Sequence, residues 1–469
     1  MTICTTRLRP RRMTAGNAGR QLGGPDAKES GPIRSPKRGA VGQKSRSQWF
    51  PYYAGFSSAF VEDVIEYLGL RAGATLLDPW LGAGTTAEVA APRGYRVKGY
   101  DLNPAMLLVA RARMLPNNTS SQLRALAESI CQSYRRRIHL HRRSSRLPPD
   151  PLEQWLQPSS AYAFRVLEQS IAATVLREYG PVSFPVWRHI RHTPAILAFL
   201  YVVLFRTLRY FIADFRTSNP AWVKIPDPKY RLQLAPDTVH DRLAFELDTL
   251  LSALQAEPQA IPPVPQSKCV IACASSLRLP IANDAVDAVI SSPPYCTRID
   301  YVMATLPELA IIGYPNGPAI RRLRDSMIGT PTIAQPPSRD TPVWGKTCSR
   351  FLSAVSRHHS KASAGYYLKY YRQYFAGTYA SLREIDRTLR PDGHCVLVVQ
   401  DSFYKDIPND LPQVIVEMGK AVGWHLKQRF DFHVKRTLAG VNPGTRQYRD
   451  RFHATESVLV LSKAQRLRV

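Results

Sequence analysis

Two short apolar segments that each end in an aspartate constrain the fold of this chain more than any other feature of its sequence. Residues 75–78 (TLLD) have the pattern of a buried strand, and residues 96–101 (RVKGYD) predict a second strand. A glycine-rich turn and a predicted helix over residues 85–91 connect them. Strands joined through a helix in this way run parallel, so we expect Asp78 and Asp101 at the same edge of one sheet, where α/β proteins bind their ligands.

The alternation of strands and helices resumes in the second half of the chain. Apolar runs of strand length recur there, separated by segments in which apolar residues have helical spacing. The predicted strands are 269–273, 284–292, 394–400, 425–434 and 457–462, and the predicted helices are 103–114, 370–389 and 411–422. The pattern therefore favours a doubly wound α/β sheet that is interrupted by two insertions.

The chain carries a large excess of positive charge. Its 469 residues include 63 lysines and arginines against 36 aspartates and glutamates, which gives a formal charge of +27 and a pI near 10.0. This charge suits a polyanionic partner, and nucleic acid is the first candidate. The longest apolar run, residues 195–205, is too short to cross a bilayer and is followed by Arg206 and Arg209, so we expect no membrane-spanning segment.

Changes in composition divide the chain into four parts. Residues 1–48 hold eleven lysines and arginines and two acids, which is typical of a disordered basic arm. This arm could bind phosphates, or it could be a solubilising tail, a mispredicted start or an organellar presequence. Residues 49–115 and 269–469 are predicted to form the two halves of the α/β domain. Residues 116–268 are predicted as a mainly helical, basic insertion, and residues 302–369 as a second, smaller insertion.

The seven cysteines are scattered along the sequence. None belongs to a Cys-x-x-Cys pair or to a Cys/His cluster with the spacing of zinc ligands, so we predict no metal site. Free thiols are typical of a reducing compartment, and we expect a cytoplasmic protein. Cys296 follows the second motif described below, but no partner base is identifiable, and we expect it to pack in the interior.

The turn after the first predicted strand reads DPWLGAGTT over residues 78–86. Gly82 and Gly84 allow the backbone to turn sharply and to approach a ligand closely. Asp101 ends the next strand, where a carboxylate can accept both ribose hydroxyls of a nucleoside cofactor. A tight turn without a ligand occurs in other α/β proteins, but the two acids flanking this turn favour a cofactor site.

A second motif, SPPY at residues 292–295, ends the predicted strand 284–292. Two consecutive prolines remove two N–H donors and fix an extended loop. The carbonyls before them and the Ser292 hydroxyl are therefore free to accept hydrogen bonds from an amino group. Tyr295 offers a ring on which a planar base can stack. The other Pro-Pro pairs of the chain lack both the apolar strand and the aromatic residue.

With these two motifs the chain resembles the amino-methylating DNA methyltransferases, which use S-adenosylmethionine to methylate the exocyclic nitrogen of cytosine or adenine. DPWLGAGTT is similar to the cofactor motif of that family, and SPPY to its catalytic (Asp/Asn/Ser)-Pro-Pro-(Tyr/Phe/Trp) motif. FPYYAGFS, residues 50–57, resembles an aromatic segment that lies against the methionine end of the cofactor. The resemblance covers residues 49–113 and 269–463 and implies a class I methyltransferase (Rossmann-like) fold with two insertions.

The resemblance also implies roles for individual residues. A serine in the first catalytic position is similar to the N4-cytosine branch of the family. Ser275 departs from the family pattern, because a carboxylate often contacts the adenine amino group at that position. The implied catalytic residues are Ser292, Pro293, Pro294 and Tyr295, and the implied cofactor-binding residues are Tyr52, Phe56, Asp78, Trp80, Gly82, Ala83, Gly84, Thr85, Asp101 and Asn103.

The family mechanism acts on a base that is flipped out of double-stranded DNA. Carbonyl and hydroxyl acceptors rehybridise the weakly nucleophilic amino nitrogen, which then attacks the sulfonium methyl in line. No covalent bond to the enzyme is needed, in agreement with the absence of a Pro-Cys dipeptide from the sequence. The resemblance further implies a restriction-modification role with a cognate restriction nuclease as a possible partner.

Several alternatives remain open from the sequence. The chain could methylate N6 of adenine in DNA, methylate amino groups in RNA, or bind nucleic acid without catalysis. Both insertions are candidates for target recognition, and their arginines form either a solvated surface or one that follows DNA. Residues 218–222 (SNPAW) could be a turn or a target-recognition loop. Arg298, Asp300 and Tyr301 could contact neighbouring nucleotides or begin a helix.

Overall fold

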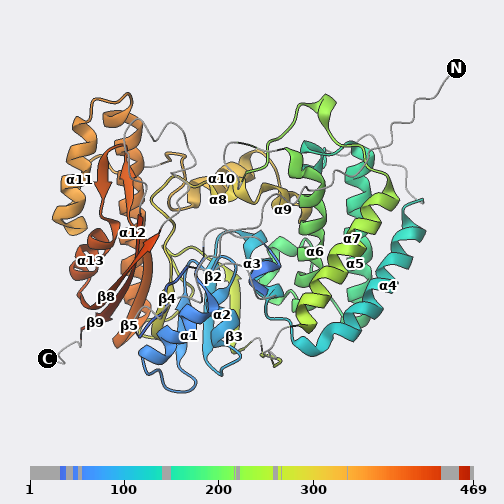
Figure 1. Cartoon of the computed structure of the whole chain (residues 1–469), viewed down its shortest axis with the longest axis horizontal. Helices are drawn as coiled ribbons and strands as arrows, with labels where there is room; N and C mark the ends of the chain where they lie inside the picture. Colours follow the sequence, from blue (N-terminus) through green and yellow to red (C-terminus); the bar gives the residue numbers. More distant parts are fainter. Residues whose placement is uncertain are drawn as a thin grey trace, which may run out of the picture.

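The fold is built on one seven-stranded sheet, with helices against both of its faces and a layer of long helices beside it (Figure 1). Predictions that concern residues 1–31, 38–45, 51–54, 140–148 and 218–221 lie outside the described residues, and Tyr52 is among them. The computed structural model describes residues 32–37, 46–50, 55–139, 149–215, 217, 222–256, 262–265, 267–334, 336–434 and 454–464.

The strand order of the sheet is β3-β2-β1-β4-β5-β9-β8. The first five of these strands are parallel, and β9 runs antiparallel to both of its neighbours. The order reverses between β1 and β4, which is the place where α/β sheets bind ligands. This is the class I methyltransferase (Rossmann-like) fold, as predicted. The strands are β1 (Thr75–Asp78), β2 (Arg96–Asp101), β3 (Cys269–Cys273), β4 (Val286–Ser291), β5 (Leu389–Gln400), β8 (Trp424–Val434) and β9 (Ala454–Lys463).

Both faces of the sheet are buried. Successive side chains of a strand point to opposite faces, so Leu76 packs in one hydrophobic core and Leu77 in the other. Leu397 of β5 likewise lies in the second core, between Val396 and Val398 of the first. The first core includes α1 (Ser58–Tyr67), α2 (Thr85–Ala90) and α3 (Pro104–Ala112), and the second includes α11 (Gly345–Arg357), α12 (Leu368–Thr388) and α13 (Leu411–Ala421).

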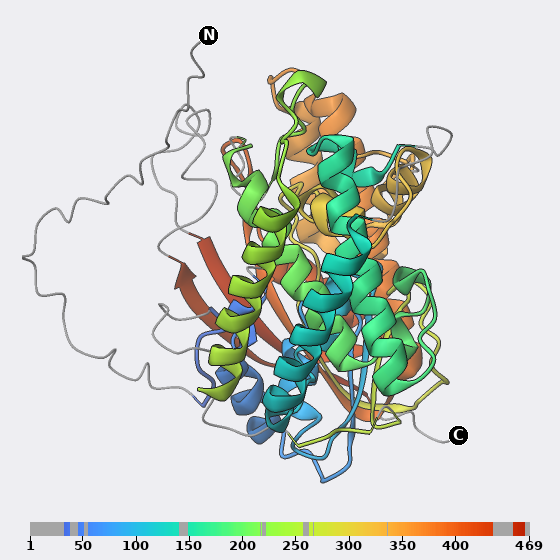
Figure 2. The same ribbon diagram turned by 90° about the vertical axis from the view of Figure 1, so that its right-hand side faces the viewer.

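Four long helices make the layer beside the sheet, and α6 packs against α3, α5 and α7 (Figures 1 and 2). The apolar helix α6 and the 3-10 turn that continues it extend over Ala195–Asp214, which is longer than the run of residues 195–205 indicated. By length and composition alone it could cross a membrane, but 72% of its most apolar window is buried inside the protein, as in a core helix. The four helices are α4 (Ser120–Arg137), α5 (Pro158–Tyr179), α6 (Ala195–Phe211) and α7 (Pro236–Gln255).

The second insertion connects the sheet to this helical layer. Arg209 of α6 forms an ion pair with the buried Glu308 (2.6 Å), and Arg165 of α5 donates to the Ala310 carbonyl (2.6 Å). These two arginines of the first insertion therefore hold the two insertions together. The connecting helices, which lie between the sheet and the helical layer in Figure 1, are α8 (Tyr301–Ala304), α9 (Leu306–Ile311) and α10 (Pro318–Ser326).

Shorter elements complete the described part of the chain. Strands β6 (Ser402–Tyr404) and β7 (Ile407–Asn409) form a separate hairpin. One π-helical turn, Ser363–Tyr367, leads directly into α12. The 3-10 turns are Arg46–Gln48, Asn117–Thr119, Pro151–Gln154, Val186–Arg188, Ile190–His192, Ile212–Asp214, Pro228–Tyr230 and Pro342–Trp344.

Residues 32–37 and 46–48 of the predicted basic arm are among the residues that the structure describes. Ile33 is buried in the first core, and the guanidinium of Arg46 is buried beneath Trp49. Arg46 donates to the carbonyls of Arg113 and Leu115, just beyond the end of α3. Carbonyls at a helix end lack partners within the helix, and Arg46 satisfies them. The sequence pattern of the arm gave no sign of this tertiary contact.

Candidate active site

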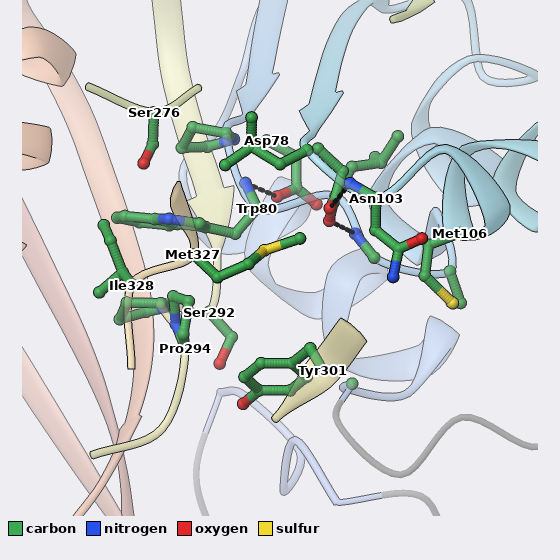
Figure 3. Close-up of a pocket in the computed structure, with 18 of the residues that line it drawn as sticks. Asp78, Trp80, Asn103, Met106, Ser276, Ser292, Pro294, Tyr301, Met327 and Ile328 are labelled. Carbon is green, nitrogen blue, oxygen red and sulfur yellow. Dashed lines mark hydrogen bonds between the residues drawn. The ribbon is translucent and has the colours of Figure 1, made fainter. Parts of the chain in front are cut away.

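A cleft opens beyond the carboxyl ends of β1 to β4, at the point where the strand order reverses (Figure 3). It encloses about 930 Å³ of space, including its open mouth. All of the predicted site residues line it except Tyr52, which lies outside the described residues, and Gly84. Two motifs that are more than 200 residues apart in the sequence therefore face one cavity.

Asp78 ends β1 at the floor of the cleft. Its carboxylate accepts hydrogen bonds from the Ser291 hydroxyl (2.5 Å) and from the backbone N–H of Trp80 (3.3 Å). Ser291 ends β4, so this bond joins the two strands on either side of the reversal point. Burial raises the pKa of Asp78 to about 6, although the hydrogen bonds oppose the rise.

Asp101 ends β2 and organises the turn beside it. One carboxylate oxygen accepts from the Gly82 N–H (2.9 Å) and the other from the Asn103 N–H (2.9 Å). Each oxygen keeps a further lone pair for a ligand hydroxyl. Burial raises the pKa of Asp101, and these backbone hydrogen bonds oppose the rise. Asn103 lines the cleft, but its side chain caps α3 through the Ala105 N–H and donates to Thr305 (2.7 Å).

Gly84 lies at the start of α2 rather than in the wall of the cleft. Its φ of 81° is in the left-handed region, and a Cβ atom there would come within 2.6 Å of the Ala110 Cβ on α3. The glycine therefore permits close packing of α2 against α3. Its predicted contact with the cofactor stays a prediction, and the structure gives it a packing role.

The donors and acceptors of the cleft fit a nucleoside cofactor with a charged amino-acid tail. The Trp80 indole N–H is buried in the wall and has no hydrogen-bond partner among the described residues. Phe56 contributes an apolar ring, as expected from the aromatic segment. On the β3 side, Ser275 lines the cleft, and its hydroxyl accepts from the Leu277 N–H (3.2 Å). Ser275 is the residue at which the resemblance led us to expect a carboxylate.

The SPPY segment forms the wall next to β4. The Ser292 hydroxyl donates its proton to the Val398 carbonyl of β5 (2.9 Å), which leaves its lone pairs available as acceptors. The Pro294 carbonyl accepts from the Tyr374 hydroxyl (2.8 Å), so that carbonyl is already engaged. The Tyr295 N–H donates to the Tyr301 hydroxyl (3.2 Å). The segment is thus held on both sides while Ser292 faces the cavity.

The second insertion contributes residues to the cleft that the sequence did not indicate. Met327 and Ile328 lie beside Trp80 and Pro294 in Figure 3. Ile328 packs at Gly377 of α12, where a Cβ atom would come within 3.2 Å of it. No periodicity or motif marks these side chains, because their position depends on how residues 302–369 fold back over the sheet.

Neighbouring contacts describe two residues that follow the catalytic motif. Asp300 is buried, caps α8 through the Met303 N–H and pairs with Arg324 (2.7 Å), so it has a structural role. Cys296 is buried, and burial raises the pKa of its thiol well above the usual value, in agreement with packing. Among the described residues no cluster of His, Cys, Asp or Glu could hold a metal ion.

Fold and cleft together define the class of protein: a class I methyltransferase fold with two acids, a glycine turn and an SPPY segment around one cavity. The chain is 27% identical over 306 residues to the Type II methyltransferase M.BsoBI of Geobacillus stearothermophilus. The match covers 61% of this chain and only 56% of that protein. No protein-family model matches the chain. The similarity supports a DNA methyltransferase family.

Proposed function

We propose that this chain is an S-adenosylmethionine-dependent DNA methyltransferase that methylates the exocyclic amino group of a flipped base, namely N4 of cytosine. The observation that carries the proposal is the Ser292 hydroxyl, whose proton is committed to Val398 and whose lone pairs remain in the cleft. An amino group needs such acceptors, and the same cleft contains two acids suited to a nucleoside cofactor. The serine, rather than aspartate or asparagine, favours cytosine.

The cofactor is proposed to lie along the ends of β1, β2 and β3. Asp101 would accept the ribose hydroxyls, and the backbone around Gly82 allows close approach. The unpartnered Trp80 N–H and the ionised Asp78 would meet the amino-acid end of the cofactor. When bound, the cofactor supplies a methyl group attached to a positively charged sulfur. A nitrogen nucleophile can take this methyl group.

Chain residues must make the amino nitrogen nucleophilic. Ser292 Oγ accepts one N–H of the base, and a backbone carbonyl ahead of Pro294 accepts the other. The nitrogen lone pair is thereby directed away from the ring. We assign this role to a carbonyl ahead of Pro294 because one lone pair of the Pro294 carbonyl already accepts from Tyr374. Tyr295 stacks on the base and, with the surrounding apolar wall, limits the access of water.

Asp101→Asn is expected to weaken cofactor binding about ten- to hundredfold. The substitution keeps the shape of the side chain but replaces charge-assisted hydrogen bonds, which are worth about 1.5–3 kcal/mol, by weaker ones. Calorimetric titration with S-adenosylmethionine measures the change.

Asp287→Asn is the matched control for this substitution. Asp287 also accepts a backbone N–H, from Thr75 (2.7 Å), but lies at the opposite edge of the sheet. The control should bind the cofactor with wild-type affinity. Equal affinities for all three proteins would remove Asp101 from the cofactor site.

Cofactor affinity should fall as the pH is lowered through about 6. The raised pKa of Asp78 means that its carboxyl is neutral below that pH and ionised above it. The sulfonium and amino groups of the cofactor are cationic, so they favour the ionised carboxyl. The loss can reach about tenfold per pH unit below the pKa. Titrations at pH 7.5, 6 and 5 test this, and Asp78→Asn should remove the fall in affinity that begins near pH 6; a flat wild-type profile would contradict it.

The proposed partner is double-stranded DNA, within a restriction-modification system that has a cognate nuclease. In a first experiment, the protein and labelled cofactor are incubated with duplex DNA and, separately, with folded RNA. In a second experiment, modified bases are located in the DNA of a host that expresses the chain. We expect label in duplex DNA at one short recurring sequence. Label in RNA alone would identify an RNA methyltransferase, and binding without label would identify an inactive nucleic-acid-binding protein.

A further inference from the structure

The segment that follows SPPY is fixed to one face of a helix by tyrosine hydroxyls. Tyr374 donates to the Pro294 carbonyl (2.8 Å), and Tyr370, one turn earlier on α12, accepts from the Arg298 N–H (3.0 Å). Both tyrosines are buried. Residues spaced by four on a helix share a face, so one face of α12 binds the backbone at both ends of the segment from Pro294 to Arg298.

A third tyrosine on the preceding turn carries the side chain of Arg298. The guanidinium carbon lies 4.8 Å from the centre of the Tyr367 ring, and Nη1 donates to the Tyr367 hydroxyl (3.2 Å). Arginine stacks on aromatic rings in this way and keeps its other N–H donors available. The side chain is therefore oriented before any ligand arrives.

The backbone at Arg298 is unfavourable for a residue with a side chain. Its φ is 58°, in the left-handed region, and it is neither glycine nor asparagine. Such conformations cost about 1–3 kcal/mol and are found most often at binding and catalytic sites. The Tyr370 hydroxyl holds this conformation through the Arg298 N–H.

Arg298 differs from neighbouring arginines in its partners. Arg324 is neutralised by Asp300 (2.7 Å), and Arg372 of α12 by Asp340 (2.7 Å). In the part of the chain that the structure describes, Arg298 has no carboxylate within ion-pair distance, and it is exposed to solvent. An oriented, exposed guanidinium without an acid partner is a site for an anion with several oxygens.

We propose that Arg298 binds a backbone phosphate of the DNA strand that carries the target base. This inference rests on the proposed function, because it places the phosphate three residues beyond the segment proposed to hold the flipped base. Arg298 then fixes the strand while Ser292 and Tyr295 hold the base. Tyr367 and Tyr370 act as positioning residues that set the direction of the guanidinium.

Equilibrium DNA binding at increasing salt tests the proposal. The slope of log affinity against log salt is proportional to the number of phosphates neutralised, at about 0.9 per phosphate. Arg298→Gln should reduce the slope by about one unit, and Arg298→Lys should preserve it. The measurement is fluorescence anisotropy with a labelled duplex that contains the modified sequence, using full-length protein in about 50–200 mM salt.

Arg71→Gln is the matched control, since Arg71 is an exposed arginine beside the amino end of β1, away from the cleft. Its slope should equal that of the wild type. An unchanged slope in Arg298→Gln, or an equal loss in Arg71→Gln, would overturn the proposal. If Arg298→Gln reduces the slope but the wild-type protein transfers no methyl group, the phosphate site is supported and the proposed function is rejected.

A second measurement changes the DNA instead of the protein, and its first step uses only the wild-type protein. Neutral methylphosphonate groups replace single phosphates on either side of the target base. With the wild-type protein, replacement at one position should reduce the salt slope by about one unit. The same replacement should have no further effect on the slope of Arg298→Gln, because both changes remove the same contact. Additive effects at every position would contradict the assignment.

Discussion

Ser292→Ala is expected to lower the rate of a single turnover by about 100-fold, which is the effect of removing one preorganised hydrogen-bond partner from a transition state. The substitution removes the acceptor that is proposed to direct the lone pair of the amino nitrogen. It also removes the bond to the Val398 carbonyl. Cofactor affinity should remain that of the wild type, since Ser292 is assigned to the base. Rapid-quench measurement of methyl transfer, together with calorimetric titration, separates these effects.

Tyr295→Phe is the control within the same segment. Its hydroxyl lies 3.4 Å from Glu456, and the proposed role of Tyr295 requires only the ring. The phenylalanine variant should therefore keep most of the wild-type rate. If Ser292→Ala also retained full activity, the SPPY segment would not be the catalytic site.

Gly84→Ala is expected to lower the free energy of unfolding by about 2–5 kcal/mol. About 1–2 kcal/mol comes from placing a side chain at a left-handed φ, and about 1–3 kcal/mol from overpacking against α3. The close approach is to the Ala110 side chain and backbone, which cannot rotate away. Denaturant unfolding, followed by circular dichroism, measures the loss.

Gly94→Ala separates the two contributions to that loss. Gly94 has almost the same φ, 85°, but a Cβ atom there would meet no atom within 4 Å. It should therefore lose only the backbone contribution, about 1–2 kcal/mol. Equal losses of unfolding free energy in the two variants would show that overpacking of α2 against α3 does not contribute to the loss in Gly84→Ala.

The parts of the site that could be predicted from the sequence are those fixed by local patterns. The apolar run ending in Asp78 and the one ending in Asp101 became β1 and β2 with the predicted bounds. Asn103 was expected to open a helix with Pro104, and it caps α3. Glycine and proline punctuation fixes where such strands end, and a parallel sheet then brings their carboxyl ends together.

Other features depend on contacts between distant parts of the chain and have no local signal. Met327 reaches the cleft only because the second insertion folds over the sheet, and Arg46 is ordered only because α3 ends beside it. Residues 391–393 (PDG), which fall between the predicted helix 370–389 and the predicted strand 394–400, lie within β5, where the pairing with β4 shifts register. Neither ladder pairs these three residues, because the pairing with β4 passes from Leu389 to His394 and the pairing with β9 begins at His394. Asp392 has a φ of 60°, so Pro-Asp-Gly keeps its local irregularity inside a continuous strand.

The identity of the methylated nucleoside tests the central claim most directly. Duplex DNA is incubated with the protein and S-adenosylmethionine labelled in the methyl group, digested to nucleosides and separated by chromatography with mass detection. The label is predicted in N4-methylcytosine. Label in N6-methyladenine would keep the amino-group chemistry and overturn the assignment to cytosine. Label in 5-methylcytosine, or no label in any nucleoside, would contradict transfer to an amino group held by Ser292.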